Sequence, residues 1–244
     1  MANWNETQQN QQQGFAGASV PRTAQVFDAG LRKHMLAIYN YMASGILLTG
    51  IIAMATAATG LALTFASGPL MWLVALSPLA IVFAMSFGAN RFSAGTLQLM
   101  FWGFAVLMGL SLSTIFLVYT GESIAATFFA TAGAFAGLSL FGYTTKKDLS
   151  GFGTFLVMGV IGLIIAMLIN FFLQSSALAL AISFIGVLIF AGLTAYDTQR
   201  LKREYQVVQG TQHAAKAVIM GALSLYLDFI NMFLFLLRFM GSRE

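Results

Sequence analysis

The chain has 244 residues, of which 59% are hydrophobic and 8% are charged, and its formal net charge is +4. A soluble domain carries about 25% charged residues, so this composition, with a mean hydropathy of +0.82, excludes an ordinary soluble protein and indicates a single integral membrane domain. The absence of cysteine excludes disulfides, thiolate catalysis and zinc–thiolate sites, and the scattering of the basic residues among short loops predicts no nucleic-acid partner.

The first predicted segment is polar and includes a run of Gln and Asn at residues 8–13. It lacks the basic start, the apolar centre and the small-residue cleavage site of a signal peptide. We therefore expect residues 1–29 to form a disordered, Gln-rich cytosolic tail and residues 30–244 to form the membrane domain.

Seven apolar blocks follow, each close to the ~20 residues that cross about 30 Å of hydrocarbon at 1.5 Å per residue. The expected spans are 35–63, 69–90, 95–119, 123–143, 152–174, 177–196 and 217–240. Several connections between them are so short that consecutive helices must be antiparallel neighbours. The blocks show no period-two alternation, so the predicted fold class is all-α, a polytopic membrane protein with seven transmembrane helices.

The basic residues predict the orientation of these helices. If the N-terminus is cytosolic, the loops 64–68, 120–122 and 175–176 lie on the opposite side and contain no Lys or Arg. Only Arg238 and Arg243 then lie outside, which fits the positive-inside rule. If the seventh block is re-entrant instead of spanning, the C-terminus returns to the cytosol.

Small residues indicate where helices can approach closely. Gly133 and Gly137 form a GxxxG pattern, and Gly159 and Gly162 add a second small face. This pattern has two interpretations, a dimer interface or packing inside the monomer, and in a bundle of seven helices we expect the second.

The sequence lacks the motifs of the membrane chemistries that we considered. His34 and His213 fall at a helix start and in a loop, no His-Glu-x-x-His or P-loop is present, and no lysine lies mid-helix to bind retinal. We therefore expect neither an enzyme nor a bound cofactor.

Two aspartates lie in or beside the apolar blocks. Asp228 is in the middle of the seventh block, where an ionisable group costs roughly 2.5–3.5 kcal/mol on insertion scales. Asp197 ends the sixth block; if that helix continues to Arg203 at the headgroups, Asp197 lies about 9 Å inside them. Asp228 lies about 18 Å along a helix that begins at Lys216. The two depths differ, so the meeting of the two carboxylates is a hypothesis that requires a tilt, a late helix start or a buried loop.

Two carboxylates that meet in a low dielectric cannot both ionise at little cost, so they share one proton. The shared proton would hold the sixth and seventh helices together. Its loss at higher pH would push them apart or admit a hard cation such as Ca²⁺, which prefers oxygen ligands. Asp197 and Asp228 are therefore candidate proton sensors and Ca²⁺ contacts, and Arg91 is a candidate counter-charge. The alternative is a static bond from an aspartate to an arginine, to Tyr226 or to Asn231 that only orients the helices.

Three segments together resemble the transmembrane Bax inhibitor motif family in its bacterial branch. They are Lys-Lys-Asp-Leu-Ser at 146–150, Ala-Tyr-Asp-Thr-Gln at 195–199 and Leu-Ser-Leu-Tyr-Leu-Asp-Phe-Ile-Asn at 223–231. The resemblance covers roughly residues 25–242. It implies seven helices, of which the last is central and wrapped by the other six. The spacing between the two aspartates is long for the bacterial branch, which predicts an extra stretch in the loop at 205–215.

The resemblance also implies a function. Family members characterised as transporters are pH-sensitive calcium leak channels in which an aspartate pair senses protons and an arginine between the second and third helices gates. By motif, the pair is Asp197 and Asp228, and Arg91 is the candidate gating arginine. The residues expected to support the pair are Tyr196, Tyr226 and Asn231.

The expected partners are the lipid bilayer of a bacterial inner membrane and Ca²⁺ as the transported ion. A second interpretation is a non-transporting protein that binds and modulates a membrane-anchored quality-control protease, with the Gln-rich tail as the contact. A third is a proton-coupled transporter, which would accumulate its ion against a gradient.

Overall fold

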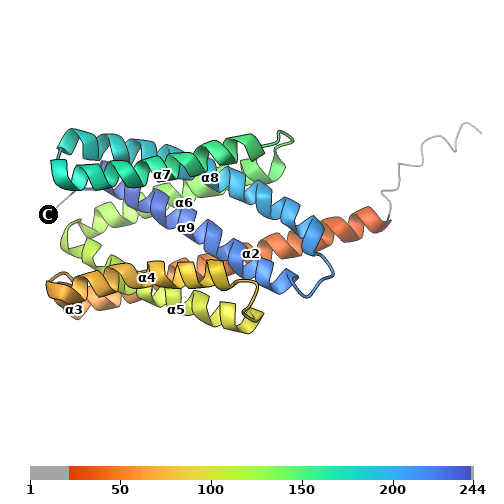
Figure 1. Ribbon diagram of the computed structural model, residues 1–244, viewed down its shortest axis with the longest axis horizontal. Helices are drawn as coiled ribbons and strands as arrows, with labels where there is room; N and C mark the ends of the chain where they lie inside the picture. Colours follow the sequence, from red (N-terminus) through yellow and green to blue (C-terminus); the bar gives the residue numbers. More distant parts are fainter. Residues whose placement is uncertain (1–21, 243–244) are drawn as a thin grey trace, which may run out of the picture.

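The computed structural model describes residues 22–242, and these residues form helices without a strand. The elements are α2 (Arg22–Ala58), α3 (Leu61–Phe65), α4 (Gly68–Gly88), α5 (Ala94–Leu112), the 3-10 helix η2 (Ser113–Leu117), α6 (Gly121–Thr144), α7 (Ser150–Leu173), α8 (Ser176–Val208) and α9 (Ala214–Met240) (Figure 1). Within the described part of the chain, seven helices are long and apolar enough to cross a membrane, with η2 extending α5. The all-α, seven-helix prediction is confirmed, and the chain is a multi-pass membrane protein.

Polar side chains and turn glycines begin and end these helices. The Oγ atom of Ser93 accepts a hydrogen bond from the amide of Thr96 (3.1 Å) at the start of α5. Thr120 and Ser175 cap α6 and α8 in the same way, because a hydroxyl satisfies one of the amides that the first helical turn leaves unpaired. Gly210, at φ +73°, turns the chain between α8 and α9 with a backbone angle that side chains disfavour.

Two helices extend beyond the predicted boundaries. Helix α2 begins at Arg22, so residues 22–29 are helical and their assignment to a disordered tail is wrong; residues 1–21 of the predicted tail lie outside the described residues. Helix α8 continues past the predicted end at residue 196 to Val208. Hydropathy detects only the apolar part of a helix, whereas Leu, Lys, Arg and Glu after residue 200 favour its continuation. The connection to α9 is therefore short, and no long loop occupies 205–215.

Helix α9 is the central helix of the described bundle. Its most apolar window is 67% buried, whereas the windows of the other six spans are 11–33% buried. It packs against α2, α5, α6 and α8, while α4 packs on α5 and α7 packs on α8. Figure 1 shows α9 crossing between the α7–α8 layer and the α3–α4 layer. The α9 helix is continuous over 27 residues, so the re-entrant interpretation of the seventh block is wrong.

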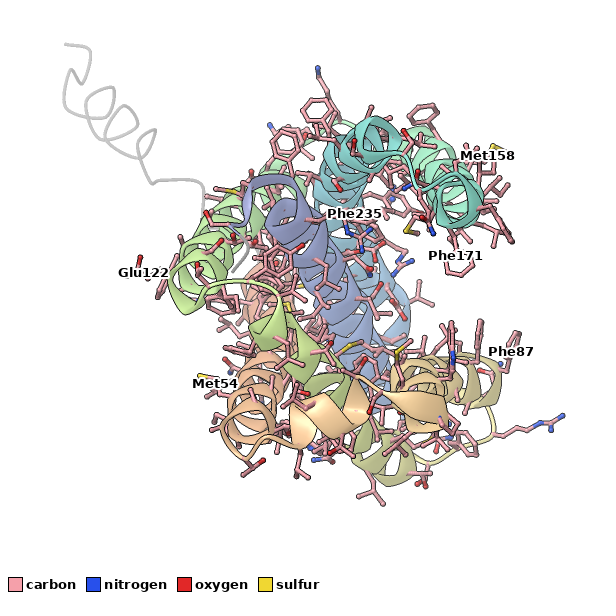
Figure 2. All side chains as sticks on the ribbon, turned by 90° about the vertical axis from the view of Figure 1, so that its left-hand side faces the viewer. Met54, Phe87, Glu122, Met158, Phe171 and Phe235 are labelled. Carbon is pink, nitrogen blue, oxygen red and sulfur yellow. The ribbon has the colours of Figure 1, made fainter. Side chains whose placement is uncertain are left out.

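The outer helices present large apolar side chains to their surroundings. Met54, Phe87, Met158 and Phe171 project away from the ribbon, whereas Phe235 lies on the central helix (Figure 2). Phe87 is 84% exposed and Phe235 is 7% exposed. A water-facing surface of this kind would be costly, so these side chains face lipid.

The small residues do not all act as predicted. A Cβ atom added at Gly133, Gly137 or Gly162 would meet nothing within 4 Å. The prediction that these glycines pack inside the monomer is therefore wrong. A Cβ atom at Gly159 would lie 2.8 Å from the side chain of Ile189, so this glycine does allow α7 to approach α8 closely.

Candidate functional site

The candidate site lies where α8 packs against α9. Asp197 on α8 and Asp228 on α9 are each only 5% exposed. Ser224 lies four residues before Asp228, hence on the same face of α9, and its hydroxyl donates a hydrogen bond to Oδ2 of Asp197. The structure thus brings the two aspartates to the same helix interface. Asp197 contacts α9 at Ser224, about one helical turn before Asp228.

Asp197 has a positively charged partner on its own helix. The Nη2 atom of Arg200 lies 3.2 Å from Oδ2 of Asp197 and donates a second hydrogen bond to Oγ of Ser224 at 3.0 Å. The Arg200 side chain is 44% exposed, whereas that of Asp197 is 7% exposed. Arg200 therefore extends from the buried carboxylate towards the outside of the bundle and offsets its charge.

Asp228 has no such partner. Its Oδ2 atom is buried and makes no hydrogen bond to any described residue. A buried carboxylate oxygen without a partner is costly, so an ionised Asp228 requires a cation, a water molecule or a structural rearrangement, and a neutral Asp228 requires a proton. The two aspartates therefore have different surroundings although they face the same interface.

Tyr226 lies on a different face of α9 from Asp228. Its hydroxyl is hydrogen-bonded to Oγ1 of Thr49 at 2.6 Å, and its ring packs edge-on against Phe101 and Phe104. Residues that are two positions apart in a helix, as Tyr226 and Asp228 are, point in directions that differ by about 200°. The predicted aspartate–tyrosine bond is therefore wrong, and Tyr226 instead fixes α9 against α2 and α5.

Asn231 and Tyr196 lie near the pair without bonding to it. The amide of Asn231 donates to the carbonyl of Leu227 at 2.8 Å, so it is bonded to its own helix. The Tyr196 ring packs against α7 at Gly153 and lies 5.9 Å from the Arg200 guanidinium. Tyr196 therefore supports Arg200 from one side.

Arg91 is not beside the aspartates in this structure. It lies exposed in the connection between α4 and α5. Among the described residues the ion pairs are Asp197–Arg200 and Asp148–Arg203, so the counter-charge at the site is Arg200. Arg200 lies three residues after Asp197, which places both side chains on one face of α8, so this counter-charge could have been identified from the sequence.

A cleft of about 200 Å³ leads to the partners of Asp197. Ser86 of α4, Arg200 and Glu204 of α8 and Ser224 of α9 provide its polar lining. Glu204 is half-buried and lines this cleft together with Arg200, which precedes it by four residues on the same face of α8. Hydropathy ends the sixth span at residue 196, so Glu204 could not be identified from it as a residue of the site.

The first two characteristic segments of the sequence meet at one end of α8. The Gln199 side chain donates to the carbonyl of Lys147 at 2.7 Å and accepts from the amide of Leu149 at 2.9 Å. Next to it, Nη1 of Arg203 lies 2.6 Å from Oδ1 of Asp148. These contacts hold the α6–α7 connection against α8, within two residues of Asp197.

The ion pair between Asp148 and Arg203 is predicted to depend on pH. Hydrogen bonds from Ser150, followed by that from Arg203, lower the pKa of Asp148 from 3.8 to about 2. A depressed pKa means that the contact is fully present above pH 3.8 and is lost as the pH falls through about 2.

We expect Asp148→Asn to raise amide hydrogen exchange at Leu149 at neutral pH. Unchanged exchange would show that Gln199 alone holds the loop.

The chain is similar in sequence to known membrane proteins. A family model described as "Inhibitor of apoptosis-promoting Bax1" matches residues 31–244. An uncharacterized protein of Caulobacter vibrioides is 49% identical over 244 residues, covering 95% of this chain and 97% of its own length. The inner membrane protein YbhL of Escherichia coli strain K12 is 47% identical over 220 residues, covering 88% of this chain and 94% of its own. With a family match over almost the whole described chain and relatives of this similarity, the chain belongs to the Bax inhibitor family of membrane proteins.

Proposed function

We propose that this protein is a pH-gated calcium leak channel in which Asp197 and Asp228 share the gating proton. The observation that carries the proposal is the pair itself, two buried carboxylates on facing helices, one of which has an oxygen without a hydrogen-bond partner. Ionisable groups at such depth are rare in membrane proteins and usually mark an ion or proton path.

The proton controls the interface between α8 and α9. While one proton is shared, a single negative charge remains, and Arg200 offsets it. When the proton leaves at higher pH, two negative charges face each other. At an effective dielectric constant of about 20, two unit charges about one helical turn apart, roughly 5.4 Å, repel by about 3 kcal/mol. A repulsion of this size is sufficient to shift a two-state equilibrium between a closed and an open helix arrangement.

The same charges favour a divalent cation. Ca²⁺ binds carboxylate, carbonyl and hydroxyl oxygens, and the cleft presents Ser86, Glu204 and Ser224 on the way to Asp197. The Asp197–Arg200 ion pair would have to open before a cation could contact the carboxylate. Arg91 lies in the connection that follows α4, the helix that carries Ser86. On the basis of the family resemblance, Arg91 is proposed as the gating arginine.

We further propose that the protein lies in a bacterial inner membrane with its N-terminus in the cytosol. The relative YbhL is an inner membrane protein. The distribution of Lys and Arg among the connections of the seven helices supports the orientation.

Ca²⁺ flux into liposomes that contain the purified chain, measured as a function of external pH, tests the proposal. We expect flux above that of protein-free liposomes, rising as the pH rises and the shared proton leaves. The ion should equilibrate and not accumulate, which separates a leak from proton-coupled transport. Absence of flux at every pH would contradict the channel and favour a protein that acts by binding another membrane protein.

A further inference from the structure

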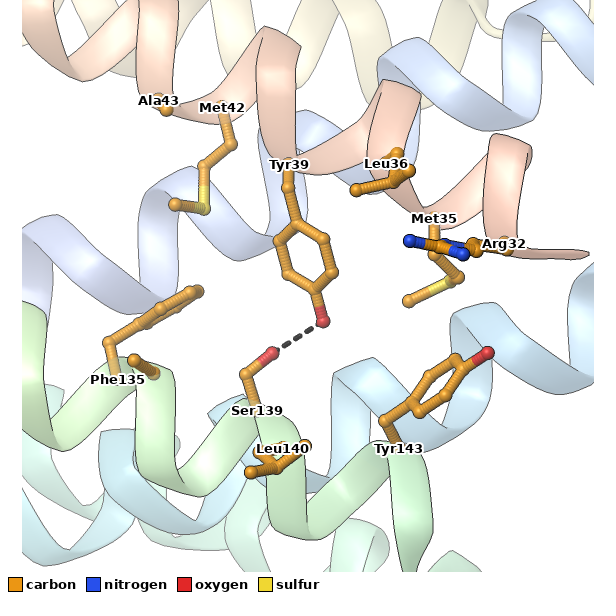
Figure 3. Close-up of a pocket in the computed structure, with 11 residues that line it drawn as sticks. Arg32, Met35, Leu36, Tyr39, Met42, Ala43, Phe135, Ser139, Leu140 and Tyr143 are labelled. Carbon is orange, nitrogen blue, oxygen red and sulfur yellow. Dashed lines mark hydrogen bonds between the residues drawn. The ribbon is translucent and has the colours of Figure 1, made fainter.

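A groove separates α2 from α6 on the outer surface of the bundle. Its volume is about 520 Å³. Figure 3 shows its apolar walls, formed by Met35, Leu36 and Met42 of α2 and by Phe135 and Leu140 of α6. Leu36 is 50% exposed and Leu140 is 64% exposed, so the groove opens towards lipid. In a bilayer, such a groove accommodates hydrocarbon chains.

The polar groups on the floor of the groove are already paired. The Tyr39 hydroxyl is hydrogen-bonded to Oγ of Ser139 at 2.5 Å (Figure 3). Oγ of Ser139 is bonded to Oγ1 of Thr198 at 2.9 Å, and Thr198 donates to the carbonyl of Thr194 at 2.8 Å. Because these hydroxyls satisfy one another, the middle of the groove requires no polar ligand and is suited to an acyl chain.

One end of the groove is basic. Arg32 is exposed, and its guanidinium group lies over the groove near Tyr143 (Figure 3). No described carboxylate forms an ion pair with Arg32. Lys202 reaches the same end, where its Nζ atom donates to the Tyr143 carbonyl at 2.8 Å and lies 5.0 Å from the ring centroid.

This basic end is at the membrane boundary. Arg32 is three residues inside the span that begins at Ala29, and Tyr143 precedes the last residue, Thr144, of the α6 span. Lipid phosphates occupy this depth, and arginine binds phosphate through paired N–H donors. A second groove of about 420 Å³, which lies between α2, α6 and α9, has no charged lining residue. The basic end therefore distinguishes the first groove from a general lipid contact.

We propose that the groove between α2 and α6 binds one anionic phospholipid, with its phosphate on Arg32 and an acyl chain along Met35, Met42 and Phe135. An anionic lipid fits better than a zwitterionic one, because a choline or ethanolamine cation would face Arg32 and Lys202. The inference does not depend on the proposed channel activity.

Native mass spectrometry of the purified protein with phosphatidylglycerol or phosphatidylcholine of identical acyl chains tests the headgroup. We expect the wild-type protein to bind phosphatidylglycerol about tenfold more tightly, because both lipids present a phosphate but only phosphatidylcholine places a cation beside Arg32 and Lys202. Arg32→Gln should lose most of this preference, since only Lys202 then remains at this end of the groove. Lys33→Gln, which removes the same charge from a neighbouring residue outside this groove, should keep the preference.

A second variant tests the position of the acyl chain. Ala136 lines the groove and is exposed, so Ala136→Phe should fill the groove without altering the core and should remove the bound lipid. An unchanged melting temperature would verify that the variant folds. Retention of the headgroup preference in Arg32→Gln, or of the bound lipid in a folded Ala136→Phe protein, would overturn the proposal.

Discussion

Asp228→Asn is expected to abolish the pH dependence of Ca²⁺ flux and to leave the protein folded. An asparagine side chain has the shape of a neutral aspartic acid, so it imitates the protonated pair at every pH. Oδ2 of Asp228 makes no hydrogen bond to a described residue, so replacing this oxygen by an amide nitrogen removes no hydrogen bond. The flux of the variant should therefore be independent of pH and close to the low-pH level of the wild-type protein.

The measurement is the rate of Ca²⁺ entry into proteoliposomes over a pH series, with equal amounts of reconstituted wild-type and variant protein. Glu122→Gln is the control, because it also replaces a carboxylate by an amide, at an exposed position in the first turn of α6. Glu122 takes no part in the contacts of Asp197 or Asp228, so its variant should keep the pH profile of the wild-type protein. The proposed gating mechanism fails if Asp228→Asn keeps that profile too.

Hydropathy alone predicted the number and order of the spans, because each helix must bury about 20 apolar residues in the hydrocarbon. It could not predict where the helices end. Most of the residues at 199–204 of α8 are polar, and all of them are good helix formers, so α8 continues to Val208. This extension is important for the site, because Gln199, Arg200 and Glu204 all lie on it.

The two aspartates could be identified from the sequence because a carboxylate among apolar residues is conspicuous. Their partners on α9 could not, since proximity in sequence is a poor guide to direction on a helix. Tyr226, two residues from Asp228, faces Thr49 and Phe104 instead. Ser224, which is four residues away on the same face, bonds to Asp197. The informative signal was the residue four positions before Asp228, and not the tyrosine two positions before it.

The pattern of small residues also could not predict which helices approach each other closely. Gly133 and Gly137 match the GxxxG pattern but have open space beside them, whereas Gly142, which was not singled out, packs against the backbone of α8. Both kinds of glycine occur on α6. Only the relative placement of α6 and α8 distinguishes them, because a pattern of small residues allows a close approach without requiring one.

Gly142→Ala is expected to destabilise the protein through this close approach. An added Cβ atom would lie 2.2 Å from the carbonyl oxygen and 3.0 Å from Cα of Ala195. These are backbone atoms of α8, so no side chain can rotate away and the two helices must separate. Overpacking of this kind typically costs about 1–3 kcal/mol, and Gly142→Val should cost more. The displacement would also strain the Ser139–Thr198 hydrogen bond.

Gly137→Ala is the matched control, because it adds the same methyl group to the same helix where nothing lies within 4 Å. Alanine is the better helix former by about 1 kcal/mol, so the control should be neutral or slightly stabilising. Thermal unfolding in detergent, followed by loss of helical signal, compares the two variants. Equal losses of stability would indicate that glycine is required on α6 for another reason. A loss confined to Gly142→Ala would locate the constraint at the contact between α6 and α8, two residues along α8 from Asp197.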